Sequence, residues 1–300
     1  MALNPVAAEI SGLVVAGRAA STDHSVEAFR AGYVQLFSYL LPTETTCTVA
    51  ATEVAGLPAL AFTPPEADGG LLVWFHGGGW VLGSSALTLS EMDLLCAQAR
   101  CRGLSVDYRL APERPFPSPQ RDAIAAAGWC VEHAADLGAD PRAVAVGGDS
   151  AGGNLAAVAA QRVEGLAAQL LVYPGCDNSR DYHAAPHAEG YLLDGFMMDW
   201  FLSHAAGGHD LSDPLVSPAL AARPVLAGVP PALVITAEFD LLRDVGRDYV
   251  DSLRAAGVHV EHAHFEEETH LFFSMPSALE GARVAIALAA SFLRLRFDAV

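Results

Sequence analysis

Residues 147–153 read Gly-Gly-Asp-Ser-Ala-Gly-Gly, and they follow directly on the apolar run Ala-Val-Ala-Val at residues 143–146. A short strand that turns sharply into a helix forces its turn residue into a strained conformation, which only very small neighbours tolerate. Such a turn lifts the hydroxyl of Ser150 above the sheet, where the free N–H groups of the following helix also point. The pattern therefore predicts a serine nucleophile, and the alternative is a glycine-rich loop that matches by chance.

Strand-like apolar runs alternate with helical segments on both sides of this turn. The runs that we expect to be strands are 71–75, 104–108, 143–146, 170–173, 232–236 and 258–265. The segments that we expect to be helices are 87–102, 120–137, 154–162, 242–256 and 276–294. This alternation predicts an α/β fold, with a mostly parallel central sheet and helices on both of its faces.

Two segments interrupt this rhythm. Within 25–41, apolar residues recur every three to five positions, which predicts an amphipathic helix. The residues of its apolar face are Val26, Phe29, Val34, Phe37 and Leu41. Residues 177–224 break the alternation again and have the character of an insertion. We expect 1–45 to be an N-terminal helical cap segment, 177–224 a cap insertion, and 46–176 with 225–300 the main domain.

A serine nucleophile needs N–H donors for the negative charge that develops on the attacked oxygen. Residues 77–79 are consecutive glycines that follow His76 and the expected strand 71–75. Glycines at the end of a strand leave their backbone N–H groups uncovered, and a flexible turn is the alternative interpretation. The N–H of Ala151, directly after the serine, is a further candidate donor.

The serine also needs a base and an acid that orients the base. In the chain order of this template the acid and then the histidine follow the serine, which leaves the histidines from His183 to His270. His270 follows the expected strand 258–265 through the acidic stretch 266–269, which we expect to be a loop.

Asp240 lies just after the expected strand 232–236 and is the candidate acid, with Glu238 and Asp244 as rivals. Asp244 falls at the start of a helix, where an acidic residue more often stabilises the helix end or a surface ion pair.

His259, His262 and His264 form a pattern that also occurs in metal sites. On a strand, however, His262 and His264 share one face and His259 points to the other. No carboxylate stands at a familiar metal-ligand spacing from them, so we favour surface or core histidines. We expect neither a metal nor a cofactor.

The composition excludes several classes of partner and mechanism. The 300 residues carry a net charge of −18, which argues against nucleic acids and anionic membranes as partners. All 17 basic residues are arginine, so a P-loop lysine and a lysine Schiff base are both excluded. No segment reaches the roughly 18 uninterrupted apolar residues of a membrane span.

The cysteines favour a reducing compartment. The chain has five cysteines, an odd number, and no C-x-x-C pair, so their pattern indicates neither a disulfide framework nor a metal site. The chain also begins without the basic and apolar regions of a signal peptide. We therefore expect a cytoplasmic protein.

Taken together, these motifs resemble the hormone-sensitive-lipase family of α/β-hydrolase carboxylesterases, in its bacterial branch with Gly-Asp-Ser-Ala-Gly. The matching segments are 76–80, 107–113, 148–154, 173–174, 217–218 and 240–244. The resemblance runs from about residue 57 to the end. It implies an α/β-hydrolase fold with a helical cap, and it implies hydrolysis of short- to medium-chain carboxylic esters through an acyl-enzyme. It also implies Ser150 as nucleophile, Asp240 as acid and His270 as base, with three oxyanion donors, namely Gly77, Gly78 and Ala151.

Two residues differ from those usual in that family, and the sequence indicates the substrate pocket less clearly than the catalytic residues. Leu271 and Leu241 stand where the family usually has glycine and proline, which bears on substrate scope more than on mechanism. The candidates for lining a substrate pocket are Trp80, Tyr191, Phe196, Met197, Trp200, Phe201 and Leu271. Aromatic residues and methionine at helical spacing are as often core residues.

Two other functions remain open. One is a receptor on the same fold that binds a small ligand without hydrolysis, a class that tends to lack the catalytic histidine. The other is hydrolysis of amides or carbamates, which the same three residues would also support. The expected partner is a small-molecule ester, and a homodimer is possible.

Overall fold

A mostly parallel eight-stranded sheet forms the centre of the molecule. The computed structural model describes residues 2–42, 44–189 and 191–300. The strands are β1 (Thr48–Val54), β2 (Leu57–Thr63), β3 (Leu71–Phe75), β4 (Arg102–Val106), β5 (Val144–Asp149), β6 (Ala168–Val172), β7 (Ala232–Phe239) and β8 (Val260–Thr269). They are ordered β1-β2-β4-β3-β5-β6-β7-β8. β2 runs opposite to the other strands, which are parallel to one another, so the predicted α/β fold is confirmed.

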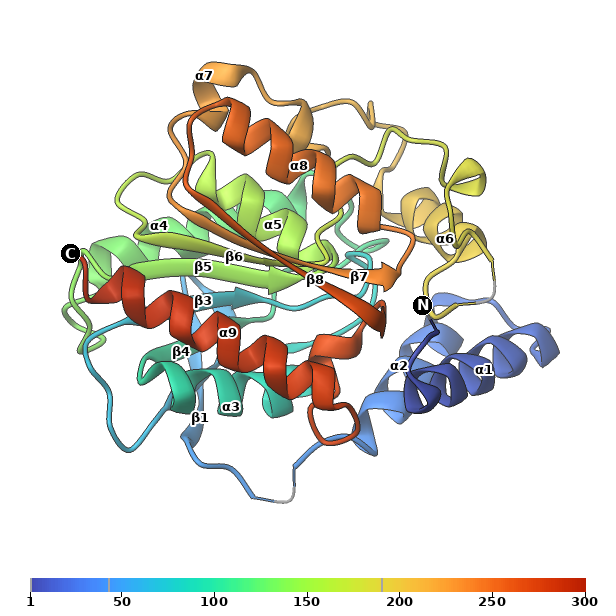
Figure 1. Cartoon of the computed structure of the whole chain (residues 1–300), viewed down its shortest axis with the longest axis horizontal. Coiled ribbons are helices and arrows are strands. Elements are labelled where there is room, and N and C mark those ends of the chain that lie inside the picture. Colours follow the sequence, from blue (N-terminus) through green and yellow to red (C-terminus); the bar gives the residue numbers. More distant parts are fainter. Residues whose placement is uncertain (1, 43, 190) are drawn as a thin grey trace.

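Helices cover both faces of this sheet (Figure 1). On one face lie α3 (Leu89–Ala99) and α9 (Glu280–Phe297), and on the other lie α4 (Ser118–His133), α5 (Ala151–Ala160) and α8 (Arg243–Ala255). Each face has its own hydrophobic core, because alternate residues of a strand point to opposite sides. In β3, Val73 packs into the core beneath α4, α5 and α8, and Trp74 packs into the core beneath α3 and α9.

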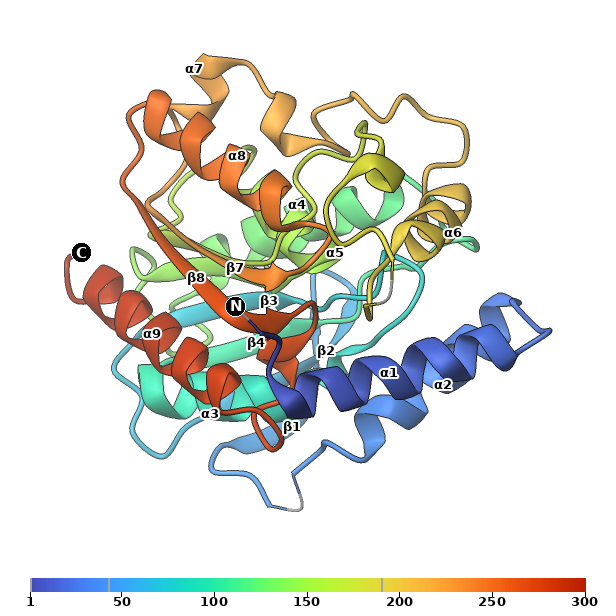
Figure 2. The same ribbon diagram turned by 45° about the vertical axis from the view of Figure 1, so that its right-hand side comes forward.

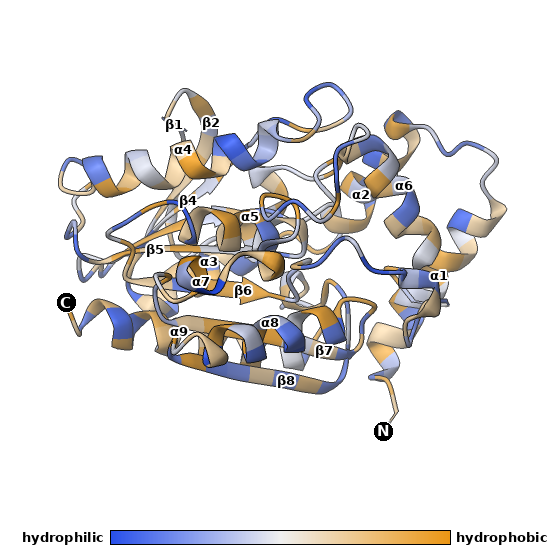
Figure 3. Ribbon diagram, turned by 90° about the horizontal axis from the view of Figure 1, so that it is seen from above, coloured by the Kyte–Doolittle hydropathy of each residue, from blue (hydrophilic) through white to orange (hydrophobic). Residues whose placement is uncertain are grey.

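The colouring by hydropathy shows the consequence of this two-sided burial (Figure 3). The central strands β5 and β6 are almost continuously hydrophobic, whereas the edge strand β8 is mixed. A parallel strand that is buried on both faces has no solvent side for polar residues, which explains the apolar runs of the sequence. Among the described residues, none of the helices combines the length and the apolar character that crossing a bilayer requires.

Three helices lie over the carboxyl ends of the strands and form a cap (Figures 1 and 2). They are α1 (Pro5–Ala20), α2 (Val26–Ser38) and α6 (Gly195–Ala205). Each begins at a side chain that accepts a hydrogen bond from a first-turn N–H, namely Asn4, Ser25 and Asp194. Shorter elements are α7 (Arg223–Leu226), η1 (Ser85–Thr88), η2 (Tyr182–Ala184), η3 (Pro218–Leu220) and η4 (Phe272–Ser274).

The amphipathic helix predicted within 25–41 is present as α2, and Val26, Phe29 and Phe37 pack inward as expected, but Val34 does not. Val34, which we placed on that face, is 51% exposed. Tyr33 instead packs against the core, and Phe37 is buried. Spacings of three to five residues fit more than one face of a helix, and packing against the main domain decides between them.

Residues 266–269 are a strand and not the acidic loop that we expected. They extend β8, and Thr269 pairs with Phe239 of β7 beyond a bulge. Glu266 and Glu267 keep their carboxylates in solvent, whereas Glu268 is only 4% exposed. Thr269 pairs with β7 and the carbonyl of Glu267 accepts the N–H of Asn4 at 2.7 Å, so backbone hydrogen bonds hold this stretch in the sheet despite its charged side chains.

Burial raises the pKa of Glu268 from its ordinary value of 4.5 to about 7. The folded protein therefore favours the protonated acid, and this contribution to stability is lost as the pH rises from about 4.5 to about 7. We predict that the free energy of unfolding of Glu268→Gln, relative to that of the wild type, is about 2 kcal/mol higher at pH 8 than at pH 5. Urea unfolding at the two pH values measures this, with exposed Glu267→Gln as the control. An equal effect of Glu268→Gln at both pH values contradicts the prediction.

Candidate active site

Ser150 occupies the strained turn that the sequence predicted between β5 and α5. Its backbone has φ 55° and ψ −117°, a region that side-chain-bearing residues rarely adopt. A Cβ on Gly148 would overlap the backbone of Gly152, and a Cβ on Gly152 would overlap the carbonyl oxygen of Phe75. The turn is therefore possible only with glycine on both sides of the serine.

Ser150, His270 and Asp240 form one hydrogen-bonded chain. His270 Nε2 lies 2.9 Å from Ser150 Oγ, and its Nδ1 lies 2.8 Å from Asp240 Oδ2. Asp240 follows β7 and His270 follows β8, so both arrive at the carboxyl edge of the sheet beside the serine. The remaining oxygen of Asp240 accepts the N–H of Leu242 at 2.8 Å. The acid, the base and the hydroxyl thus stand in the order that nucleophilic catalysis by serine requires.

The other candidate acids are engaged elsewhere. Glu238 accepts a hydrogen bond from Arg243 at 2.6 Å, and its second oxygen lies 3.0 Å from His264. Asp244 lies in the first turn of α8 and pairs with Arg243 at 2.8 Å, as its position predicted. Neither reaches His270.

The oxyanion donors differ from our expectation at one position. Gly77 donates its N–H to Asp149 Oδ1 at 2.8 Å, inside the protein, so this N–H is not available to a substrate. Gly78 and Gly79 both have positive φ angles, 113° and 59°. Among the described residues, the N–H groups of Gly78, Gly79 and Ala151 find no acceptor. The free donors beside Ser150 are therefore the N–H groups of the second and third glycines and of Ala151.

A buried polar network supports the glycine loop from behind. The Tyr108 hydroxyl donates to the carbonyl of His76 at 2.8 Å, and the two rings are stacked. His76 Nδ1 lies 2.8 Å from the carbonyl oxygen of Gly77, and burial lowers the pKa of this imidazole. Burial raises the pKa of Asp149 to about 6 and that of Glu91 well above its ordinary range. The loop thus rests on groups whose charges are disfavoured by their surroundings.

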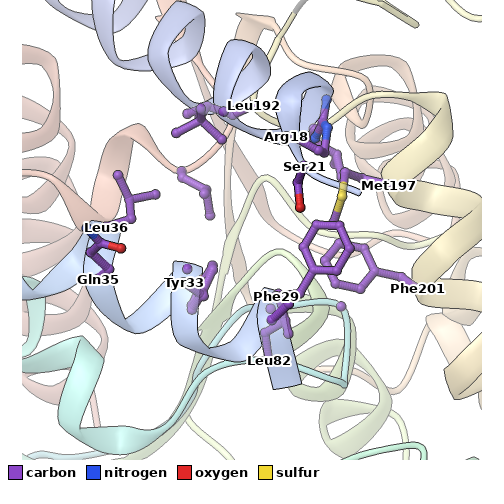
Figure 4. A pocket seen from close by; sticks show the side chains of 18 of the residues that line it. Arg18, Ser21, Phe29, Tyr33, Gln35, Leu36, Leu82, Leu192, Met197 and Phe201 are labelled. Carbon is purple, nitrogen blue, oxygen red and sulfur yellow. The ribbon is translucent and has the colours of Figure 1, made fainter. Parts of the chain in front are cut away.

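A cavity of about 670 Å³ lies between this loop, the triad and the cap. Its walls are mainly apolar, and its polar lining includes Ser150 and His270. The N-terminal helices contribute Leu13, Arg18, Phe29, Tyr33 and Leu36 (Figure 4). Leu192, Met197, Phe201 and Leu271 also line the cavity. A volume of this size is typical of a site for a small molecule.

A family model described as the alpha/beta hydrolase fold matches residues 72–274, which is more than half of the chain. The chain belongs to the α/β-hydrolase family. Among its relatives, LipN, a carboxylic ester hydrolase of Mycobacterium tuberculosis, is 42% identical over 239 residues. That match covers 73% of this chain but only 61% of the length of LipN. An ethyl acetate hydrolase of Pseudomonas putida is 38% identical over 242 residues, 75% of this chain and 74% of that protein.

Solved structures of this α/β-hydrolase family match nearly the whole chain. A hyperthermophilic esterase from the archaeon Pyrobaculum calidifontis superposes with a TM-score of 0.90 at 31% identity, covering 98% of this chain and 99% of that one. An ester hydrolase from the Lake Arreo metagenome, complexed with a phosphonate derivative, gives a TM-score of 0.89 at 34% identity and covers 99% of both chains. These relatives place the protein among the serine carboxylic-ester hydrolases of the hormone-sensitive-lipase branch.

Some of the residues predicted to line the pocket do so in the structure, and others do not. Met197, Phe201 and Leu271 line the cavity. Trp80, Tyr191, Phe196 and Trp200 do not: Trp80 and Trp200 are buried in the core, and Phe196 is 43% exposed. On α6, Met197 and Phe201 are four residues apart and share the face that points at the site.

The departure at Leu271 has a local explanation. Leu271 adopts φ 68°, a left-handed conformation that glycine accommodates more readily. Its side chain, 9% exposed, faces the cavity beside His270. Leu241 is buried in the core next to the triad acid. Both departures change packing and leave the reacting groups in place.

Some residues of the site were missed from sequence. Tyr173 packs its ring 4.7 Å from that of His270 and is buried. Arg18, Tyr33 and Leu36 line the cavity from the first two helices. The amphipathic pattern indicated that these helices pack on something, but it did not indicate which of their residues reach the site.

The three histidines His259, His262 and His264 have separate surroundings. His262 and His264 both lie close to the hydroxyl of Thr236, at 2.8 and 3.0 Å, and His259 is exposed near Glu261. Within the described ranges, no group of histidine, cysteine and acidic residues is arranged to hold a metal ion.

We predict that Asp149→Ala lowers kcat at least about tenfold, because the N–H of Gly77 loses its acceptor and the glycine loop loses its fixed position. Asp149→Asn keeps a carbonyl oxygen at the same place and is expected to retain more activity. Steady-state kinetics on an aryl ester measures both, alongside thermal melts that report folding. A folded Asp149→Ala variant with wild-type kcat contradicts this role.

Proposed function

We propose that this carboxylesterase cleaves esters with short to medium acyl chains through a covalent acyl-enzyme on Ser150. The observation that carries the proposal is the unbroken chain from Asp240 through His270 to Ser150, with separations of 2.8 and 2.9 Å, at the floor of an apolar cavity. The mainly apolar walls suit an acyl chain, and the polar groups are concentrated where the ester carbonyl would lie.

In the first half of the reaction, Ser150 Oγ attacks the ester carbonyl carbon while His270 Nε2 accepts the hydroxyl proton. The carbonyl electron pair moves to oxygen, and the resulting anion is held by the N–H groups of Gly78, Gly79 and Ala151. The intermediate then expels the alcohol, which takes its proton from His270. The products of this half are a free alcohol and an acyl group on Ser150.

In the second half, a water molecule takes the place of the alcohol. His270 accepts one of its protons as the water oxygen attacks the acyl carbon, and the same N–H groups hold the second oxyanion. Collapse of this intermediate returns the proton to Ser150 and releases the carboxylic acid. Asp240 keeps the imidazole oriented and stabilises its positive charge in both halves.

The complete triad argues against a receptor function. A protein that only binds its ligand has no need of a histidine placed between a serine and a carboxylate, and here all three groups are in contact. Hydrolysis of amides or carbamates uses the same groups, and the substrates that are turned over distinguish it from ester hydrolysis.

We propose the same division of the chain that the sequence suggested, with 1–45 and 177–224 as the cap and the rest as the catalytic domain. Contacts across the cap support it, because the Trp200 indole donates to the carbonyl of His24 at 3.0 Å and its ring packs on Phe29 at 4.5 Å.

A cytoplasmic location and a homodimer are also proposed. The five cysteines are free and buried, which suits a reducing compartment. On α9, Val284, Leu288 and Leu295 are exposed apolar residues on the outside of the molecule. Cell fractionation tests the location, and the mass in solution tests the dimer.

We predict that Ser150→Ala lowers kcat for aryl acetate, butyrate and hexanoate esters by at least about 10³-fold, because no other hydroxyl replaces the nucleophile. Ser203→Ala, on the outer side of α6, serves as the matched control. For the wild type, kcat/KM is expected to fall for acyl chains longer than the cavity holds. Retained turnover by Ser150→Ala, or a preference for amides over all esters, contradicts the proposal.

A further inference from the structure

Arg18 brings a positive charge into a largely apolar cavity. It lies in the last turn of α1, its side chain is only 11% exposed, and it lines the cavity near Ser21 and Met197 (Figure 4). Among the described residues that line this cavity, no other carries a guanidinium group. Burying a guanidinium is unfavourable unless its N–H groups have acceptors, so Arg18 needs hydrogen-bond partners at this position.

Only part of that capacity is satisfied within the protein. Arg18 Nη2 donates to a carboxylate oxygen of Asp194, whose other oxygen caps α6 through the N–H of Met197. A guanidinium has five N–H donors on three nitrogens. Among the described residues, Nε and Nη1 of Arg18 have no acceptor. The remaining donors are thus free for a group inside the cavity.

The charges around Arg18 indicate what that group is. Asp194 already neutralises the guanidinium. An anionic group on a ligand would be repelled by this carboxylate. A neutral oxygen acceptor, such as a carbonyl, accepts a hydrogen bond from a charged donor without that repulsion.

We propose that Arg18 is a specificity-determining residue that binds a second, neutral carbonyl oxygen of the substrate. The preferred substrates are then keto esters and diesters, whose reacting carbonyl lies at Ser150 and whose other carbonyl lies beneath the cap at Arg18. This inference rests on the proposed ester hydrolysis and specifies its substrate class.

A purely structural role for Arg18 is the competing explanation, because its ion pair with Asp194 also joins α1 to α6. Arg30 offers a matched comparison. It joins α2 to the main domain through Glu113 at 2.7 Å and the carbonyl of Val81 at 3.0 Å, but it does not line the cavity. Loosening the cap at Arg30 therefore leaves the donors inside the cavity in place.

The test compares two aryl esters of equal chain length, the pentanoate and the 4-oxopentanoate, by the ratio of their kcat/KM values. Effects common to both esters cancel in this ratio. In Arg18→Met/Asp194→Asn both charges are removed while the asparagine oxygen still caps α6. The preference for the oxo ester is expected to fall about tenfold in this variant. In Arg30→Met the ratio is expected to stay at the wild-type value.

Asp194→Asn alone provides a second test that keeps Arg18. Its guanidinium then lacks the neutralising carboxylate, so turnover of an aryl glutarate half-ester, relative to the pentanoate, is expected to rise about tenfold. An unchanged oxo preference in the double variant, or an equal loss in Arg30→Met, overturns the role of Arg18. A wild type that hydrolyses neither neutral ester overturns the proposed function itself, and this inference with it.

Discussion

The site depends on the close approach of backbone to backbone at the turn after β5. The backbones of Phe75 and Gly152 lie so close together that no Cβ fits between them, and Ser150 adopts a left-handed conformation at this turn. Strain of this kind persists only where the surrounding structure holds it in place. Here the buried central sheet does so, and the serine hydroxyl is raised to the edge where β3, β7 and β8 also end. Each of these strands delivers one further part of the site.

A second constraint is that buried charged groups hold both the glycine loop and the cap in place. The glycine loop after β3 is fixed by a hydrogen bond from Gly77 to the buried Asp149, whose pKa is raised to about 6 by burial. The N-terminal helices and α6 close the site from above, and they carry Arg18 and Asp194 into its wall. Both arrangements keep charged groups in unfavourable surroundings, which is tolerable because each is engaged by a specific partner.

The sequence predicted the parts that depend on strand ends and failed where packing decides. Ser150, Asp240 and His270 are each placed by a strand that ends at one edge of a parallel sheet, so chain order and strand pattern suffice. One oxyanion donor, Gly77, was wrongly predicted, because its acceptor Asp149 is distant in sequence and comes close only when the sheet forms. The cap was predicted as helices, but their rotation, and with it the lining of the cavity, depends on contacts that spacing alone does not specify.

The most direct measurement is a crystal structure of the protein after reaction with an aryl alkylphosphonate, a tetrahedral mimic of the transition state. The account predicts a covalent bond from Ser150 Oγ to phosphorus. It also predicts a phosphoryl oxygen about 2.7–3.1 Å from the backbone nitrogens of Gly78, Gly79 and Ala151, with the N–H of Gly77 still on Asp149. A phosphonate on any other residue, or an oxygen held by Gly77 in place of Gly79, would contradict it.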